Sequence, residues 1–310
     1  MRAKQYSIYD APPPAHWYSH RVGWFGKALT GTLVVSLSVV GGFSYVFTQN
    51  NIRSLASAAS QTETLDKANA TPLPPVAAQN IVDLQPVLDA WVAENPNQQW
   101  GIMVKSLDGP TFNASAQADR QFKSASMYKL FLTLPLFEMV AAEHQKGVNV
   151  NVNGKQRSLA TCVDLMLRVS NNECGDAIGQ YVDWQKATSI LQERGFKQTD
   201  FSKRSGLETS AGDTAAFLEQ LHGDLFNRNA KDTIMTSLKQ QRWRAGIPTG
   251  CPGCETANKT GTIDKVMHDA AIIEYNGGTY VLSIFSEGGS FKQIAQVTGQ
   301  IQQRILDTTQ

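Results

Sequence analysis

The 310-residue sequence lacks the features that mark several simple classes of protein. Its 28 basic and 27 acidic residues leave a formal net charge of +1, which makes general nucleic-acid binding a poor interpretation. Four cysteines and 12 prolines exclude a disulfide-dense mini-protein and a collagen-like chain, and there is no internal repeat. With 42% hydrophobic and 18% charged residues, the composition fits one large globular domain or two small ones.

One long stretch, residues 28–48, has no charged side chain. As a helix it would span about 30 Å, the thickness of one bilayer core. Residues 1–27 carry four basic residues and one acidic residue, which predicts that they are cytoplasmic. We therefore expect a single-pass cell-membrane anchor with the rest of the chain outside the cytoplasm. Two alternatives are a buried core helix and a signal peptide cleaved near Ala56-Ser57-Ala58, which resembles a small-residue cleavage site.

Residues 49–79 are polar, rich in alanine and end in a cluster of three prolines. Prolines disfavour both helix and sheet, so this stretch is typical of a tether. We expect the folded domain to occupy residues 80–310.

All four cysteines belong to this expected domain: Cys162, Cys174, Cys251 and Cys254. An even number of cysteines outside the cytoplasm suggests disulfides. Local spacing favours the pairs 162–174 and 251–254, although three pairings are possible. A four-cysteine zinc site, with the Cys-Pro-Gly-Cys run as one knuckle, is one alternative. Free buried thiols are another.

Hydrophobic periodicity predicts helices and strands in an uneven order. Helices are expected at 80–94, 125–144, 158–169, 172–183, 184–194, 211–225, 230–241 and 289–307. Strands are expected at 99–105, before 120, and at 256–261, 268–276 and 279–286. This order predicts one antiparallel sheet built from both ends of the domain, with a helical region inserted between them.

Three short motifs follow one another in this domain. Ser126-Met127-Tyr128-Lys129 is an S-x-x-K motif in an expected helix, where residues three apart share a face and the hydroxyl can meet the amine. A serine nucleophile needs an adjacent base, and a lysine with a lowered pKa can serve as one. Ser170-Asn171-Asn172 falls between two helices, and Lys259-Thr260-Gly261 on a strand. Taken singly, these motifs are also explained by a helix cap, a turn and a strand end.

S-x-x-K, S-x-N and K-T-G in this order resemble the motifs of the penicillin-recognising serine hydrolases, which are the class A β-lactamases and the D,D-peptidases. The resemblance covers residues 80–310 and extends to Gly246-Ile247-Pro248 and to His268-Asp269-Ala270-Ala271. It implies an α/β (α+β) fold, in which a five-stranded antiparallel sheet is flanked by helices and joined by an all-helical subdomain.

The resemblance also implies a role for each motif residue. Ser126 would attack a carbonyl and form an acyl-enzyme, and Lys129 would take its proton. Ser170 would pass a proton to the leaving nitrogen. Lys259 would attract a substrate carboxylate and help keep Lys129 neutral. The expected substrate-binding residues are Asn172, Thr260, Gly261 and Thr262.

The expected oxyanion hole consists of the backbone N–H groups of Ser126 and Thr262, and the helix that starts at Ser126 would add favourable charge. The resemblance implies no metal and no cofactor, and the five histidines show no ligand spacing.

The sequence departs from the family pattern in two places. The middle residue of the second motif is Asn171, where the family usually has aspartate. Class A β-lactamases also carry an E-x-x-L-N loop, whose glutamate activates the hydrolytic water, and no such motif lies between residues 195 and 213. The nearest acids are Glu193, Asp200 and Glu208. Glu208 is a candidate base or a capping residue. Without a positioned base, the acyl-enzyme should hydrolyse slowly.

Four functions are compatible with these motifs and departures. The preferred one is a membrane-anchored, class A-like hydrolase of β-lactams or related amides. The alternatives are a D,D-peptidase acting on cell-wall peptides, a non-catalytic penicillin-binding sensor, and a serine amidase such as a glutaminase. The expected partner is a small β-lactam or a peptidoglycan peptide, with no nucleic acid, and we expect a monomer.

Overall fold

The computed structural model describes residues 81–203 and 206–309. The expected cytoplasmic segment, membrane span and tether (1–27, 28–48 and 49–79) lie outside these residues. In the part of the chain that is described, no helix is both long enough and apolar enough to cross a membrane.

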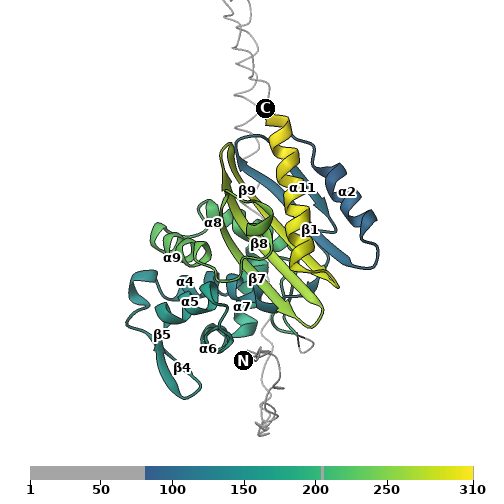
Figure 1. Ribbon diagram of the computed structural model, residues 1–310. Coiled ribbons are helices and arrows are strands. Elements are labelled where there is room, and N and C mark those ends of the chain that lie inside the picture. The colour runs from purple at the N-terminus through teal and green to yellow at the C-terminus, as the bar shows by residue number, and fades with distance from the viewer. Residues whose placement is uncertain (1–80, 204–205, 310) are drawn as a thin grey trace, which may run out of the picture. The chain divides into compact units, whose positions relative to one another are not determined.

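A five-stranded antiparallel sheet, in the order β2-β1-β9-β8-β7, forms the centre of the domain (Figure 1). Its strands are β1 (Gln99–Asp108), β2 (Asn113–Ala116), β7 (Glu255–Ile263), β8 (Val266–Tyr275) and β9 (Gly278–Glu287). Strands from the two ends of the domain meet where β1 pairs with β9. This arrangement confirms the predicted α/β (α+β) fold with a sheet built from both ends.

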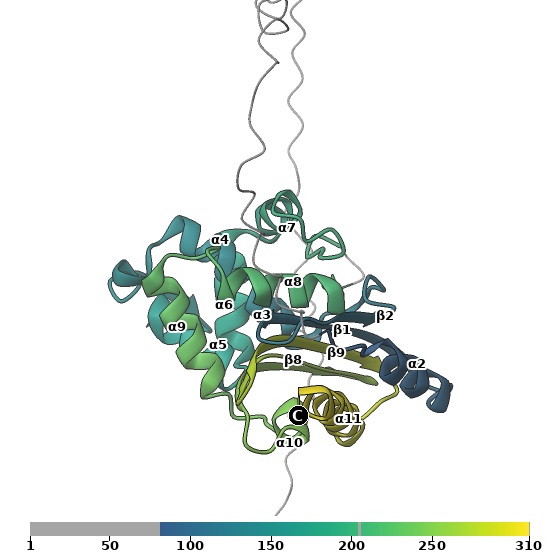
Figure 2. The same ribbon diagram turned by 90° about the horizontal axis from the view of Figure 1, so that it is seen from above.

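Successive side chains along each strand point to opposite faces of the sheet, so the hydrophobic core is divided into one cluster on each face. Tyr280, Leu282 and Ile284 of β9 pack in one hydrophobic cluster, whereas Val281 and Phe285 pack in the other, as the period of two in a strand requires. Helices α2 (Gln85–Glu94) and α11 (Phe291–Thr309) contribute to the first cluster, and α8 (Ala211–His222) to the second. Figure 2 shows α11 and α8 on opposite faces of the sheet.

The remaining helices form the helical region that the sequence predicts between the strands. They are α5 (Leu159–Arg168), α6 (Asn172–Val182), α7 (Trp184–Glu193) and α9 (Arg228–Lys239). Phe131 lies at the centre of this region, with the rings of Phe196, Phe201 and Phe217 packed edge-on around it.

The predicted long helix over 125–144 is wrong in extent. The segment forms a 3-10 turn, η1 (Ala125–Met127), then α3 (Tyr128–Phe131), α4 (Thr133–Met139) and a second turn, η2 (Ala142–His144). Pro135 has no N–H to donate to the carbonyl of Phe131, so the helical ladder is interrupted between α3 and α4. Since Ser126 precedes a helix of only four residues, the expected contribution of a helix dipole is small.

Several short elements were not predicted. They are the hairpin of β4 (Asn149–Val152) and β5 (Lys155–Ser158), the pair of β3 (Phe122–Lys123) and β6 (Glu208–Thr209), and α10 (Ile247–Gly250). The hairpin has a sequence signal, because valines alternate with asparagines before Asn153-Gly154. Both turn residues have positive φ, 51° and 81°, as a tight hairpin turn demands.

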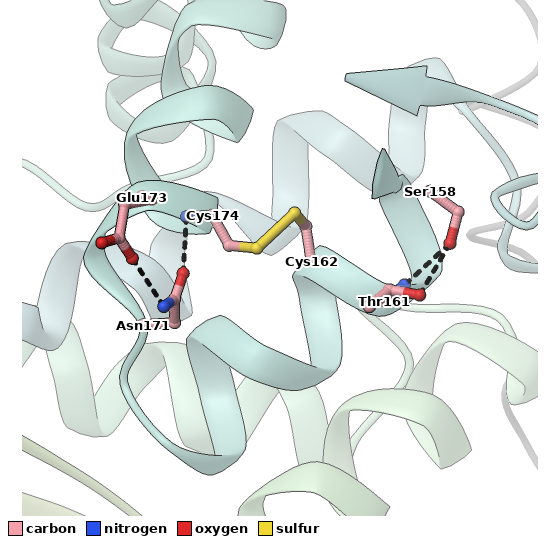
Figure 3. The surroundings of a disulfide bond; sticks show 6 residues. All are labelled: Ser158, Thr161, Cys162, Asn171, Glu173 and Cys174. Carbon is pink, nitrogen blue, oxygen red and sulfur yellow. Dashed lines mark hydrogen bonds between the residues drawn. A yellow bond between two sulfur atoms is a disulfide. The ribbon is translucent and has the colours of Figure 1, made fainter. Parts of the chain in front are cut away.

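Two disulfides join the four cysteines in the locally spaced pairs, Cys162–Cys174 and Cys251–Cys254. The first links α5 to α6 (Figure 3). Side chains cap both helices: Ser158 Oγ accepts from Thr161 N at 3.2 Å, and Asn171 Oδ1 accepts from Cys174 N at 2.8 Å. These pairs replace the zinc-site and free-thiol alternatives. In residues 81–203 and 206–309, no group of three or more His, Cys, Asp and Glu side chains could hold a metal ion.

Candidate active site

The S-x-x-K motif brings its hydroxyl and its amine together. Ser126 lies on η1 and Lys129 on α3, less than one helical turn apart, and Lys129 Nζ donates to Ser126 Oγ at 3.0 Å. Ala125 has a φ of +46°, a left-handed conformation that costs roughly 1–3 kcal/mol for a residue other than glycine. The chain therefore holds a strained residue immediately before the candidate nucleophile.

Lys129 is fully buried, and its ammonium group is surrounded by acceptors. Nζ donates to the backbone carbonyl of Ser170 at 2.6 Å and to Asn172 Oδ1 at 2.6 Å. Burial lowers the pKa of Lys129 to about 7, although the carboxylates of Asp176 and Glu173 oppose the shift. A large fraction of this lysine is therefore neutral at neutral pH, in the form that can accept a proton.

The Ser-Asn-Asn motif forms the turn between α5 and α6. Ser170 has a left-handed backbone conformation, with a φ of +58°. Its backbone carbonyl accepts a hydrogen bond from Lys129 Nζ. Asn171, rather than Asn172, is the N-cap of α6. Asparagine and aspartate cap helices about equally well, which explains why the departure from Ser-Asp-Asn leaves the turn intact. Asn172 is then free to contact Lys129.

The Lys-Thr-Gly motif lies on β7, at the edge of the sheet. Lys259 is fully buried, and its Nζ donates to Ser170 Oγ at 3.0 Å and to the carbonyl of Thr260 at 2.7 Å. Burial first, and then the charge of Lys129, hold the pKa of Lys259 well below its usual range. Ser170 Oγ is thus shared by two lysines, since Lys129 Nζ also lies 3.4 Å from it.

Gly261 allows this edge of the sheet to approach the nucleophile turn. A Cβ at this position would lie 3.1 Å from Met127 Cγ and 3.2 Å from Ala125 Cβ. Thr260 is buried, whereas Thr262 is partly exposed on the same strand. The structure therefore brings the three motifs into one site, from segments up to 133 positions apart (Ser126 to Lys259).

A buried carboxyl group outside the three motifs interacts with the charge of Lys259, and sequence analysis predicted no separate role for it. Asp269 on β8 pairs in register with Thr260 and accepts from Asn258 Nδ2 at 2.9 Å and from Ile247 N at 2.9 Å. Burial raises its pKa to about 7, against the opposing effects of these hydrogen bonds and of the charges on Lys259 and Arg244. An aspartate inside a run of apolar strand residues is the signal that could have identified it.

In the segment where a deacylating base was expected, the acidic side chains have other partners or positions. Glu208 on β6 forms an ion pair with Lys203, and β6 pairs with β3. Asp200 accepts hydrogen bonds from the backbone and the side chain of Ser202, while Glu193 is the last residue of α7. The candidate role of Glu208 as the base therefore receives no support from the geometry.

Comparison with known proteins identifies the family. Residues 83–309 match the model of the beta-lactamase enzyme family, and the chain belongs to that family. The resemblance seen in the three motifs is thereby confirmed. No curated protein matches the sequence significantly.

Solved structures share the fold. PBP-A is 20% identical with a TM-score of 0.65, over 72% of this chain and 96% of PBP-A. A β-lactamase from Sphaerobacter thermophilus is 20% identical with a TM-score of 0.63, over 74% of this chain and 98% of the other. A mutant of the reconstructed class A β-lactamase of the last common ancestor of Gram-negative bacteria is 15% identical with a TM-score of 0.64, over 73% and 98%. At these identities the likeness concerns the fold alone.

Proposed function

We propose that this protein is a serine hydrolase that opens β-lactams or related amides through an acyl-enzyme at Ser126. The observation that carries the proposal is the hydrogen-bonded series of Ser126 Oγ, Lys129 Nζ, Ser170 Oγ and Lys259 Nζ. Membership of the beta-lactamase family supports it. So does a structural neighbour, a PBP-A mutant described as an acyl-enzyme complex with penicillin G.

In the acylation step, neutral Lys129 takes the proton of Ser126 as Oγ attacks the carbonyl carbon. The carbonyl oxygen becomes an oxyanion, and the backbone N–H groups of Ser126 and Thr262 donate to it. The proton on Lys129 then passes to Ser170 Oγ, and Ser170 gives its own proton to the nitrogen as the C–N bond breaks. The products are an ester at Ser126 and a free amine, with both lysines returned to their starting state.

The remaining motif residues would orient the substrate. Since Asn172 Oδ1 accepts from Lys129, the Nδ2 group of Asn172 can donate to the amide of the substrate side chain. Lys259 and the hydroxyl of Thr260 would bind a substrate carboxylate, and Gly261 keeps β7 close enough to do so. Because Lys259 lies beside Ser170, a carboxylate arriving there would favour the protonated form of this lysine and pair with it.

A D,D-peptidase acting on cell-wall peptides is the second candidate. It is favoured by the absence of an E-x-x-L-N motif from the sequence and by the ion pair that holds Glu208, because both predict a long-lived acyl-enzyme. Anchoring through residues 28–48 would suit it, since its substrate lies beside the membrane. We propose an extracytoplasmic, membrane-anchored protein on the strength of that uncharged run and of two disulfides.

Intact-mass spectrometry of the full chain with penicillin G tests the proposal. We expect a single adduct on the wild type and none on Ser126→Ala, whereas Ser189→Ala, an exposed serine on α7, should label normally. A persistent adduct would favour the peptidase, and rapid turnover the β-lactamase. Labelling of Ser126→Ala would disprove the nucleophile, and no labelling of the wild type would disprove the penicillin-recognising function.

A further inference from the structure

We infer that Asp176, which lies outside the three motifs, is the general base that activates water to hydrolyse the acyl-enzyme at Ser126. The inference rests on the proposed function and deepens it, since it supplies the carboxylate that the missing E-x-x-L-N loop would have provided. Four observations support it: the position of Asp176 on α6, its contact with Tyr128, its nearness to Lys129, and the engagement of the other nearby acids.

Asp176 occupies the same face of α6 as a residue of the site. It follows Asn172 by four positions, and residues four apart on a helix are neighbours on its surface. Asn172 itself accepts from Lys129 Nζ at 2.6 Å. Asp176 is exposed at the surface of α6, whereas Lys129 is fully buried. This carboxylate therefore lies one helical turn from the site, on the side that water can reach.

A tyrosine from the S-x-x-K motif holds Asp176 in place. Tyr128 Oη donates to Asp176 Oδ1 at 3.1 Å. The ring of Tyr128 packs edge-on against Trp184 and Phe201, with centroid separations of 5.6 and 6.4 Å. Asp176 Oδ2 accepts no hydrogen bond from any residue within 81–203 or 206–309. One carboxylate oxygen is thus fixed, and the other is available to a water molecule.

The same tyrosine connects Asp176 to the candidate base of acylation. Lys129 Nζ lies 5.5 Å from the centroid of the Tyr128 ring. Both side chains cross over Gly175, where a Cβ would come within 2.6 Å of Tyr128 Oη and 2.9 Å of Lys129 Cε. The charge of Asp176 also acts on Lys129 and raises its pKa. Only glycine at position 175 permits this close packing of Tyr128, Lys129 and α6.

Asp176 has the chemical character that the step needs. Desolvation raises the pKa of its carboxyl group from the usual range, despite the hydrogen bond from Tyr128 and the charge of Lys129. This shift brings its basicity closer to neutral pH, where a general base is most effective. The neighbouring acids are engaged elsewhere: Glu173 accepts from Asn171 Nδ2 at 2.6 Å, and Glu208 is paired with Lys203.

Hydrolysis of the acyl-enzyme would proceed through a tetrahedral intermediate. A water molecule attacks the ester carbonyl carbon at Ser126 while Asp176 takes one of its protons, which gives a tetrahedral intermediate. The bond from this carbon to Ser126 Oγ then breaks, and the electron pair stays on Oγ. Ser126 Oγ takes a proton from Lys129, with which it is hydrogen-bonded, and the proton held by Asp176 returns to Lys129 through water. The acid product carries the hydroxyl of the water, and the enzyme regains Ser126 in its starting state.

The test separates acylation from deacylation on the full chain with penicillin G. Mass spectrometry measures the rate of adduct formation and, after removal of free penicillin, the lifetime of the adduct. For Asp176→Asn we expect a lifetime that is longer by roughly 100-fold or more, as is typical for loss of a general base, with acylation changed only a few-fold. Asp176→Glu should restore part of the hydrolysis. The wild-type hydrolysis rate should fall on acidification as Asp176 is protonated, and this dependence should disappear in Asp176→Asn.

Glu173→Gln is the matched control, because Glu173 lies on the same turn of α6 and also raises the pKa of Lys129. Its adduct should keep a lifetime within a few-fold of the wild type. Equal effects of Asp176→Asn and Glu173→Gln would overturn the inference in favour of simple electrostatics. An unchanged lifetime in Asp176→Asn would overturn it, as would an Asp176→Glu adduct that lasts as long as that of Asp176→Asn or a wild-type adduct that never hydrolyses. None of these outcomes contradicts the proposed function, whereas an unlabelled wild type would disprove both the proposed function and the role of Asp176.

Discussion

The two sides of the candidate site are built in different ways. On the side of the three motifs, Lys129 and Lys259 are fully buried and meet at Ser170 Oγ. On the other side, residues 196–203 and 206–210 carry two partly exposed acids, Asp200 and Glu208, and both lie beside Lys203. Both sides are anchored by buried residues, such as Phe196 and Phe201 on the second, but only the first side buries the titratable side chains themselves.

The difference matters because the two halves of the reaction make different demands. Acylation needs groups whose protons move over fixed, short distances, and buried lysines between helix and sheet satisfy that need. Deacylation needs a carboxylate beside an incoming water molecule. Nothing in residues 196–203 and 206–210 is arranged in this way, and the exposed Asp176 lies on the helix that begins at the second motif. The comparison therefore predicts large effects from changes on the motif side and small ones from changes on the other.

Replacing Lys129 should give the largest effect. For Lys129→Met, which keeps the length of the side chain, we expect acylation by penicillin G to slow by roughly 10²–10⁴-fold, the usual contribution of general acid–base catalysis. The time course of adduct formation measures this directly.

The matched control is Lys186→Met, which alters an exposed lysine of α7 and should label at the wild-type rate. Thermal unfolding of Lys129→Met distinguishes lost chemistry from lost structure. Since the substitution leaves the Ser170 carbonyl and Asn172 Oδ1 without their donor, we expect a modest fall in the melting temperature and a variant that remains folded. Normal acylation in this variant would mean that another group takes the serine proton.

The pH dependence of acylation should give the next largest effect. Because Lys129 must be neutral to act and its pKa is lowered to about 7, the acylation rate should rise about tenfold per pH unit below 7 and level off above it. Rates of penicillin G labelling between pH 5 and 9 test this expectation.

The Glu173→Gln variant sharpens the same experiment. Removing that carboxylate takes away one influence that raises the pKa of Lys129, so the inflection should move to lower pH. An inflection near pH 10 in the wild type would contradict the effect of burial, because Lys129 would then titrate like a lysine in water.

The sequence was sufficient to predict the motif side, for a physical reason. Ser126 and Lys129 are three residues apart, so local helical geometry alone brings them together. Alternation of apolar residues along β8 and β9, and the turn at residues 276–278, predicted the hairpin that supports β7. These features depend on contacts between near neighbours, which a single sequence displays.

The groups that the sequence did not reveal meet over long separations. Tyr128 and Asp176 are 48 positions apart, and their contact depends on the packing of α3 on α6 at Gly175. Asp269 contributes through the register of β7 and β8, which periodicity does not fix in detail. The extent of helix 125–144 is a different kind of error, since Pro135 is visible in the sequence and its missing N–H is enough to interrupt the helical ladder.

Releasing Glu208 should give the smallest effect. Lys203→Ala removes an ion pair whose two side chains are 38% and 27% exposed, and such surface pairs contribute about 0–1 kcal/mol to the free energy of unfolding. The backbone pairing of β6 with β3 still holds Glu208, so the lifetime of the penicillin adduct should stay within a few-fold of the wild type. Glu208→Gln should behave in the same way. A much shorter lifetime in Lys203→Ala, together with a much longer one in Glu208→Gln, would make Glu208 the deacylating base, and the contrast between the two sides of the site would disappear.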